Sequence, residues 1–306
     1  MPGWSETIKR IAEGENPHSA LRKQLIRLSD KRGGRNVIVY SSGFMQKDGM
    51  KGTEIDSNDK HAFMAIIHGL KRRAGLDLLL HTPGGDAFAT NSLIYYMREM
   101  FGGDVEVFVP QMAMSGGTII ACASTMIHMG KPSNLGPIDP QMPTPWGMQP
   151  ATGIMSGWKR AKKSLEEGAS DAALWVNIVA KYPLDTIIAC ENAINWSVST
   201  VKDLLATGMF KNEAGSAAKI DKIVEGLSMP EHTVGHARQL TLKEVKDLGL
   251  KVKELEKDQE LQDLVMDIHH ICMYIFGATP SLKIVANHLG NALERHQVQY
   301  PIPKQV

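Results

Sequence analysis

The sequence predicts an α/β protein whose N-terminal half contains a parallel sheet and whose C-terminal half is mostly helical. Three short runs rich in Val, Ile and Leu, at residues 36–40, 76–81 and 105–109, are typical of buried strands. A stretch with helical periodicity separates each run from the next, and strands that alternate with helices form parallel sheets with crossover helices. From about residue 155 onward the apolar spacing is helical.

The individual elements follow in chain order. The helical stretch at 5–30 is interrupted between Gly14 and Pro17, because glycine and proline break helices. A helix is expected at 59–74, where basic residues in the last turn suit the helix dipole. The remaining expected elements are helices at 87–100 and 118–123, a strand at 125–129, and helices at 172–181, 186–206, 214–225, 241–249 and 259–276.

One domain with three regions is expected, because neither a repeat nor a linker interrupts the chain. Residues 1–35 would form an N-terminal helical segment, and residues 36–160 the α/β core. Residues 161–306 would form a helical part of the same domain that serves as a lid or as an oligomer interface.

Composition narrows the class of protein. Basic and acidic residues nearly cancel, with 34 Lys and Arg against 33 Asp and Glu, so we expect no nucleic-acid partner. The three cysteines are far apart and form no CxxC pair, which argues against a disulfide framework and a zinc site. No signal peptide and no long apolar run is evident. We therefore expect a soluble, cytoplasmic protein without a membrane span.

Two glycine-bearing joints follow successive predicted strands. The first is "HTPGG" at 81–85, and the second is "PQMAMSGG" at 110–117. Because ligand crevices of open α/β sheets lie at the carboxyl ends of strands, both joints should face one cleft. Ser115 would stand at a strand-to-helix turn, the position of a nucleophile elbow, although the G-x-S-x-G pattern lacks its first glycine. Glycine amides can approach a substrate closely and form an oxyanion hole.

Simpler interpretations stand beside this one. A glycine pair after a strand is often only a turn, and a serine at a helix start is often an N-cap. His81 is more typical of a core or turn histidine than of a base. No phosphate-binding glycine motif occurs at either joint, so we expect neither a nucleotide nor any other cofactor, and no metal.

The chain resembles the serine dehydrogenase proteinase family, which is related to signal peptide peptidase A and to the Clp proteases. The similarity is dense in "LLLHTPGGDAFAT" and in "VEVFVPQMAMSGGTIIACASTMIHMGKPSNLGPIDPQ", and thinner in "GHARQLTLKEVKDLGLKV" and "VQYPIP". The resemblance implies a Clp/crotonase-like spiral of ββα units that assembles into homo-oligomers.

The resemblance places the family's catalytic residues on this sequence. It implies that Ser115 is the nucleophile and that amides of Gly84 or Gly85 and of Gly116 form the oxyanion hole. The chain has Gly116 where the family pattern more often has alanine. A Clp-type histidine would fall on Pro140, so a Clp-type triad is not available there.

The general base stays open between lysine and histidine. In the signal peptide peptidases a downstream lysine pairs with the serine, and "MSGWKRAKKSLEEG" offers Lys159, Lys162 and Lys163. Such a run is also typical of a solvated helix face, and a lysine is a base only when its pKa falls from about 10.4 toward neutrality. We favour Lys159, next to Trp158. His236, on the family's histidine, is the alternative.

Three functions are compatible with these residues. The first is a serine peptidase, ATP-independent in itself, that cleaves protein or peptide substrates. The second is a catalytically weak Clp-like protein that binds peptides or acts as a scaffold. The third is an acyl-CoA enzyme of the crotonase type, against which the serine and the lack of a basic phosphate patch argue.

Overall fold

The structure of the chain is a computed structural model that describes residues 3–168, 171–228 and 238–297. His236 and the segment 298–303, both singled out in the sequence, lie outside the described residues. Among the described residues no single helix meets the length and hydropathy needed to cross a membrane, although α7 (Ala172–Val179) and α8 (Leu184–Thr207), bent by 77°, pass together on those two criteria.

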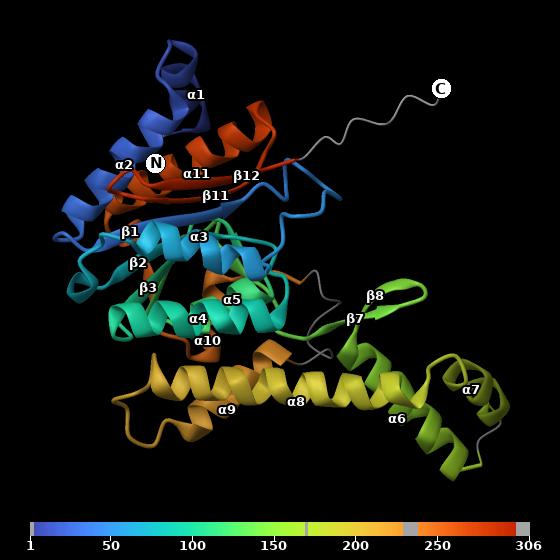
Figure 1. Cartoon of the computed structure of the whole chain (residues 1–306). Coiled ribbons are helices and arrows are strands. Elements are labelled where there is room, and N and C mark those ends of the chain that lie inside the picture. Colours follow the sequence, from blue (N-terminus) through green and yellow to red (C-terminus); the bar gives the residue numbers. More distant parts are fainter. Residues whose placement is uncertain (1–2, 169–170, 229–237, 298–306) are drawn as a thin grey trace, which may run out of the picture.

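A seven-stranded sheet forms the centre of the molecule (Figure 1). Its strand order is β10-β5-β3-β2-β1-β11-β12. The first five of these are parallel to their neighbours, and β11 and β12 are added antiparallel at the β1 side. The strands are β1 (Asn36–Ser42), β2 (Leu76–His81), β3 (Val105–Val109), β5 (Met126–Met129), β10 (Val252–Glu254), β11 (Ser281–Asn287) and β12 (Ala292–His296).

Helices cover both faces of this sheet because its strands are apolar on both sides. In β1, Ile38 and Tyr40 belong to one buried cluster, and Val37 and Val39 belong to another, as the strand period of two requires. One face packs against α3 (Ser57–Ile67), α4 (Ala87–Phe101) and α5 (Gly116–Cys122). The other packs against α1 (Trp4–Ala12), α2 (Pro17–Lys31) and α11 (Gln259–Ala278).

Smaller elements complete the fold. A second sheet joins β4 (Met112–Ala113), β6 (Asn134–Leu135) and β9 (Leu240–Thr241), and β7 (Gln141–Thr144) forms a hairpin with β8 (Gly147–Pro150). The other helices are α6 (Ala151–Glu166), α7 (Ala172–Val179), α8 (Leu184–Thr207), α9 (Ala217–Ser228), α10 (Leu242–Leu248), η1 (Arg72–Ala74) and η2 (Leu255–Lys257).

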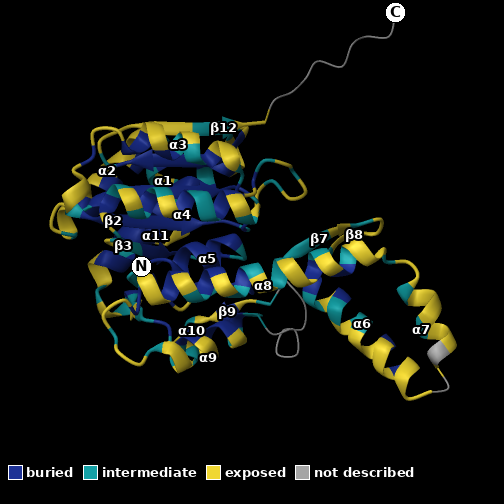
Figure 2. Cartoon of the chain, turned by 60° about the horizontal axis from the view of Figure 1, so that its bottom comes forward, coloured by how far each residue is buried: buried dark blue, intermediate teal, exposed yellow. Residues whose placement is uncertain are grey.

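An arm extends from the body of the molecule. We define it as the β7–β8 hairpin, α6, α7 and the first half of α8. In Figure 1 the long helix α8 runs under the sheet and out to α6 and α7. Figure 2 shows buried residues gathered inside the body, chiefly in its sheet, and α7 as largely exposed. The arm thus has little core of its own.

The four N-terminal strands expected from the sequence are confirmed, and two other expectations need correction. The helix expected at 59–74 ends at Ile67, because Gly69 takes a left-handed φ of 85° and the chain then forms only the short helix η1. The C-terminal part is not purely helical, because β10, β11 and β12 belong to the central sheet.

A charged network fixes the end of the sheet where the parallel strands begin. Asp77 is fully buried and accepts hydrogen bonds from Nε of Arg32 and Nε of Arg35, both at 2.7 Å. Arg32 also donates to Glu106 on β3 at 2.8 Å. Burial alone would raise the pKa of Glu106, but its hydrogen bond with His128 and the nearby positive charges lower that pKa to about 2.

This lowered pKa predicts acid sensitivity. The pKa of Glu106 falls from 4.5 to about 2 on folding, so its contribution to stability is complete above pH 4.5 and is lost as pH falls toward 2. We expect the free energy of unfolding to fall over this range by roughly 3 kcal/mol more in the native protein than in Glu106→Gln. Urea unfolding at each pH measures this. Glu99→Gln, at an exposed helix position, is the control and should behave as the native protein.

Candidate active site

Backbone hydrogen bonds place the two glycine-bearing joints side by side. The N–H of Thr82 donates to the carbonyl of Met112, and the N–H of Met114 donates to the carbonyl of Thr82, both at 3.0 Å. These two bonds extend the pairing of β2 and β3 past the strand ends, through a bridge between Thr82 and Ala113. The two joints therefore lie together at the carboxyl ends of the strands, and the expectation that they face one cleft stays a prediction.

Ser115 occupies a strained turn between β4 and α5. Its φ of 49° and ψ of −110° make it the one non-glycine residue with positive φ among the described residues. Its side chain caps no helix N–H, which disfavours the N-cap interpretation. The residue is half-buried, and its hydroxyl makes no hydrogen bond within the described chain. A serine held in this way on a strand-to-helix turn has the geometry of a nucleophile elbow.

Gly84 lies directly against this turn. A Cβ at Gly84 would stand 2.7 Å from the Cβ of Ser115 and 2.9 Å from the amide nitrogen of Gly116. Its φ of 93° also belongs to the left-handed region. Glycine is therefore required here by both space and conformation. The N–H of Gly84 donates to Oγ1 of Thr82 at 3.2 Å, so this amide is already engaged.

Gly85 is held from both sides by Ile55, in the loop before α3. The N–H of Ile55 donates to the carbonyl of Gly84 at 2.7 Å, and the N–H of Asp86 donates to the carbonyl of Ile55 at 2.9 Å. A Cβ at Gly85 would stand 2.3 Å from the backbone nitrogen and oxygen of Ile55. Asp86 also caps α4 through its side chain, as its sequence position predicts.

Two amides remain without a partner beside Ser115. Within the part of the chain that the structure describes, the N–H groups of Gly85 and Gly116 donate to no acceptor. A Cβ at Gly116 would stand 2.7 Å from Oγ1 of Thr90, which explains why this chain has glycine where alanine is more usual. Unengaged amides on two joints that meet at a serine are free to donate to an oxyanion.

The three candidate lysines do not contact Ser115. Lys159 lies on α6 in the arm, where its side chain is exposed and makes no ion pair or hydrogen bond with a described residue. Lys162 and Lys163 form surface ion pairs with Glu166 and Glu167, at 3.8 and 3.9 Å. The geometry thus assembles the serine and the glycines in the body of the molecule and places all three lysines in the arm.

The sequence pattern of the ClpP-like SDH-type serine proteinases matches residues 18–275. The chain belongs to this family. The resemblance seen in the sequence is thereby confirmed, and so is the Clp-like α/β fold, with a parallel sheet whose carboxyl end carries the serine and the glycines. The match covers the arm and most of the body, and it leaves out α1, β11 and β12.

Two uncharacterized proteins of Methanocaldococcus jannaschii are similar to the chain. MJ0137 is 30% identical over 198 residues, which are 65% of this chain and 60% of MJ0137. MJ1495 is 32% identical over 231 residues, which are 76% of this chain and 68% of MJ1495. Among solved structures, a mutant of the 1510-N membrane-bound stomatin-specific protease matches with a TM-score of 0.43 and 17% identity, over 69% of this chain and 79% of that protein.

His81 is not available as a base. Its ring lies on the face of β2 that packs against α11, with its centroid 4.8 Å from that of His269 and 4.9 Å from that of Phe44. Burial lowers the pKa of His81 to about 3, so the ring is neutral near pH 7. It supports the first joint from behind the sheet, as a core histidine.

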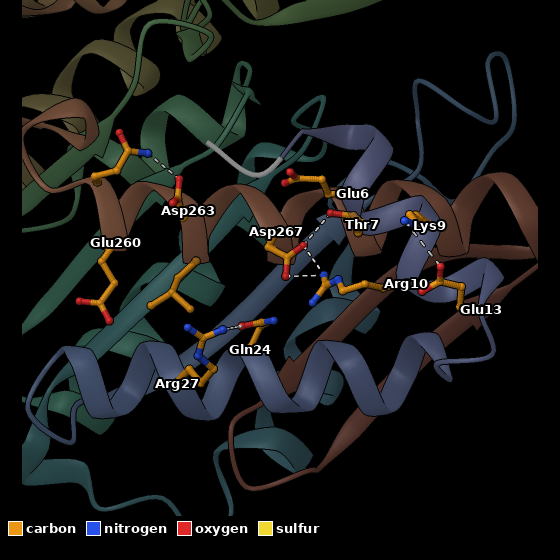
Figure 3. A pocket seen from close by; sticks show the side chains of 12 residues that line it. Glu6, Thr7, Lys9, Arg10, Glu13, Gln24, Arg27, Glu260, Asp263 and Asp267 are labelled. Atoms are coloured by element: carbon orange, nitrogen blue, oxygen red, sulfur yellow. Dashed lines mark hydrogen bonds and ion pairs between the residues drawn. The ribbon is translucent and has the colours of Figure 1, made fainter.

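A groove with a volume of about 820 Å³ lies elsewhere, among α1, α2 and α11, and Ser115 is not part of its lining (Figure 3). Four of its charged side chains pair with one another, Arg10 with Asp267 and Lys9 with Glu13. Among the described residues no group of three His, Cys, Asp or Glu side chains is placed to bind a metal ion.

The strain at Ser115 predicts a difference between two substitutions. Alanine keeps a Cβ in the unfavourable φ region, whereas glycine has none. We therefore expect the free energy of unfolding of Ser115→Gly to be about 1 kcal/mol higher than that of Ser115→Ala. Both variants lack the hydroxyl, so the comparison isolates the backbone. Urea unfolding measures the difference, and a Ser115→Ala variant at least as stable as Ser115→Gly would show that the turn is relaxed.

Proposed function

We propose that this member of the family is an active serine peptidase whose nucleophile is Ser115. The observation that carries the proposal is the positive-φ serine beside the unengaged amides of Gly85 and Gly116. Membership of a serine proteinase family supports the same chemistry. Protein or peptide substrates are proposed, since a peptide carbonyl fits a site made of backbone donors.

The proposed reaction follows acyl-transfer chemistry. Oγ of Ser115 attacks the carbonyl carbon of the scissile peptide bond, while a base removes the hydroxyl proton. The amides of Gly85 and Gly116 donate to the oxyanion, each such donor contributing roughly 3 to 4 kcal/mol to transition-state stabilisation. The base passes the proton to the leaving amine, the C–N bond breaks, and water then hydrolyses the acyl-enzyme.

Lys159 is our proposed base, with Lys162, Lys163 and His236 as alternatives. A lysine removes a proton only when it is itself uncharged, which requires burial or a nearby positive charge. Lys159 is exposed in the isolated chain. We therefore propose that it becomes buried when the arm meets a second copy of the chain, and that it serves the Ser115 of that copy.

The surface of the arm supports a homo-oligomer. A small cavity of about 310 Å³ opens between α6, α7 and α8 and is lined mostly by apolar side chains. Large apolar side chains are exposed around it, which is typical of surfaces that contact another protein. They include Trp146, Met148, Leu174, Val176, Leu184 and Ile188.

A second candidate function is a Clp-like protein that binds peptides without cleaving them. The observation in its favour is the lack of contact between Ser115 and any described base. A serine without a base is a weak nucleophile, but the same amides would still bind a peptide carbonyl. Covalent labelling separates the two functions.

Fluorophosphonate labelling tests the nucleophile. We expect the native protein to be modified at Ser115 and Ser115→Ala to remain unmodified, because only an activated serine attacks the probe. Ser92→Ala, at another half-buried serine, is the matched control and should be labelled as fast as the native protein. Mass spectrometry of the digested protein locates the adduct. A folded native protein without an adduct on Ser115 would favour the peptide-binding function.

The base is tested by substitution and by mixing. Lys159→Met should slow labelling of Ser115 by a factor of about 10² to 10⁴, the usual contribution of a general base. Lys162→Met and Lys163→Met, which remove residues held in surface ion pairs, should have little effect.

Mixed oligomers show where the base comes from. If Lys159 acts across copies, Ser115→Ala and Lys159→Met chains should recover peptide hydrolysis when they are refolded together. Recovery is absent if each chain supplies its own base. Equal activity of Lys159→Met and the native protein would exclude Lys159 as the base and leave His236 as the leading alternative.

A further inference from the structure

A buried ion pair lies next to the loop that holds Gly85. Lys283, in the middle of β11, has only 2% of its surface exposed, and Asp59, in the first turn of α3, has 5%. Nζ of Lys283 contacts both carboxylate oxygens of Asp59, at 2.7 and 2.8 Å. The hydroxyl of Tyr40 on β1 donates to the same carboxylate at 2.9 Å.

Two further hydrogen bonds of this cluster go to the backbone on either side of Ile55. Nζ of Lys283 donates a third bond to the carbonyl of Glu54, at 2.7 Å. The carboxylate of Asp59 accepts from the N–H of Asp56, at 2.9 Å. An ammonium has three donors, so Lys283 is fully engaged. The residues before and after Ile55 are thus both fixed to buried charges.

Ile55 passes this constraint to the candidate oxyanion hole. Its N–H and carbonyl bond to Gly84 and Asp86, the two neighbours of Gly85. Gly85 itself donates to nothing in the described chain. A continuous path of hydrogen bonds therefore leads from Lys283 and Asp59, through the backbone of residues 54–56, to the Gly84–Gly85 peptide that carries the free amide and to the Gly85–Asp86 peptide that follows it.

Stability alone gives little reason for such a pair. Removing two charges from water costs several kcal/mol for each ion, and well-packed apolar residues of similar volume are often as stable or more so. A buried ion pair does, however, fix relative positions, because its atoms have one good arrangement. The segment that this arrangement holds in position is the backbone from Gly84 to Asp86.

We propose that Lys283 and Asp59, with Tyr40, form a positioning cluster that sets the Gly85 amide where the oxyanion develops. The proposal rests on the function proposed above for Ser115 and the glycines. An oxyanion donor works at 2.7 to 3.1 Å from the oxygen, and a misplacement of about 1 Å can lower a rate about a hundredfold. Lys283 touches no substrate; it acts through the loop.

The test variant is Lys283→Met combined with Asp59→Asn, which removes both charges and leaves no unpaired ion in the core. A second ion pair with a similar set of bonds, whose cation Arg10 is 38% exposed, provides the control. Asp267 of α11 is 5% exposed, accepts two bonds from Arg10 at 2.6 and 2.7 Å, and accepts one from the hydroxyl of Thr7 at 2.6 Å (Figure 3). Arg10→Met with Asp267→Asn removes this pair, and no hydrogen bond of the pair reaches Ile55.

The first measurement is hydrogen exchange at the amides of Ile55 and Asp86, which needs no activity. We expect exchange at both to become about tenfold faster in the test variant and to stay unchanged in the control. This exchange measurement decides the structural part of the proposal even if the native protein proves not to be a peptidase. Unchanged exchange in the folded test variant would overturn the proposal.

The second measurement separates the oxyanion hole from the nucleophile. In a Ser115→Cys background, acylation by p-nitrophenyl acetate forms an oxyanion, whereas alkylation by iodoacetamide does not. We expect the cluster substitution to slow acylation about tenfold to a hundredfold and to leave alkylation unchanged. An equal loss in both reactions would show general damage to the cleft and would overturn the positioning role, as would no loss in either.

A milder pair of variants keeps the proposal open to refutation if the double variant does not fold. Tyr40→Phe removes one bond to Asp59 and keeps the ion pair, and Thr7→Val is its matched control at Asp267. Tyr40→Phe should shift exchange at Asp86 and acylation in the same directions by a smaller factor. A Tyr40→Phe protein identical to Thr7→Val in both measurements would contradict the proposal. Failure of the peptidase function would appear separately, as absence of labelling at Ser115 in the native protein.

Discussion

The close approach of Gly84 to the turn at Ser115 is the constraint on which the candidate site depends. The two backbone bonds between Thr82 and residues 112 and 114 bring the joints together, and a side chain at Gly84 would collide with the turn. With that contact in place, Ser115 and the amide of Gly116 on one joint lie beside Gly85 on the other. The serine, the two free amides and the strained φ are therefore consequences of one packing arrangement.

The two ends of the parallel sheet differ in chemistry. Where the strands begin, Asp77 and Glu106 are paired with two arginines, and this charged network fixes the register of β2 and β3. Where the strands end, the described groups nearest Ser115 in the two joints are mainly backbone groups. Backbone amides held by a packed sheet can act on a developing oxyanion without having to reorganise.

The strands of the core, and the serine and glycines of the candidate site, could be predicted from the sequence because they depend on local signals. Val-rich and Ile-rich runs mark the parallel strands, and glycines at the ends of two of them mark the place where backbones meet. Ile55 carries no such signal, because it contributes backbone hydrogen bonds, and every residue except proline has the same backbone groups. Lys283 gives a misleading signal, since a lysine in a short strand is typical of an exposed edge and here is buried.

The C-terminal strands and the base were harder for a different reason. β11 pairs with β1 from the far end of the chain, and an antiparallel addition of this kind follows no alternation rule that a sequence displays. The lysines of α6 look like a solvated helix face, and in the isolated chain they are one. If Lys159 is the base, as proposed, its function would depend on contact with another surface, and such a contact leaves no mark in the local sequence pattern.

The separation between body and arm has a physical logic. An oxyanion hole must be accurate to tenths of an ångström and undergoes no chemical change, so it suits the backbone of a packed sheet. A base must exchange a proton and lose its charge, so it suits a side chain whose burial depends on assembly. Here the accurate part is fixed by Gly84, Ile55 and the buried Lys283, whereas the proposed base stands on an exposed arm. A chain built in this way would hold a preformed but inactive site until the arm finds its partner surface, which would keep the serine from attacking proteins before assembly.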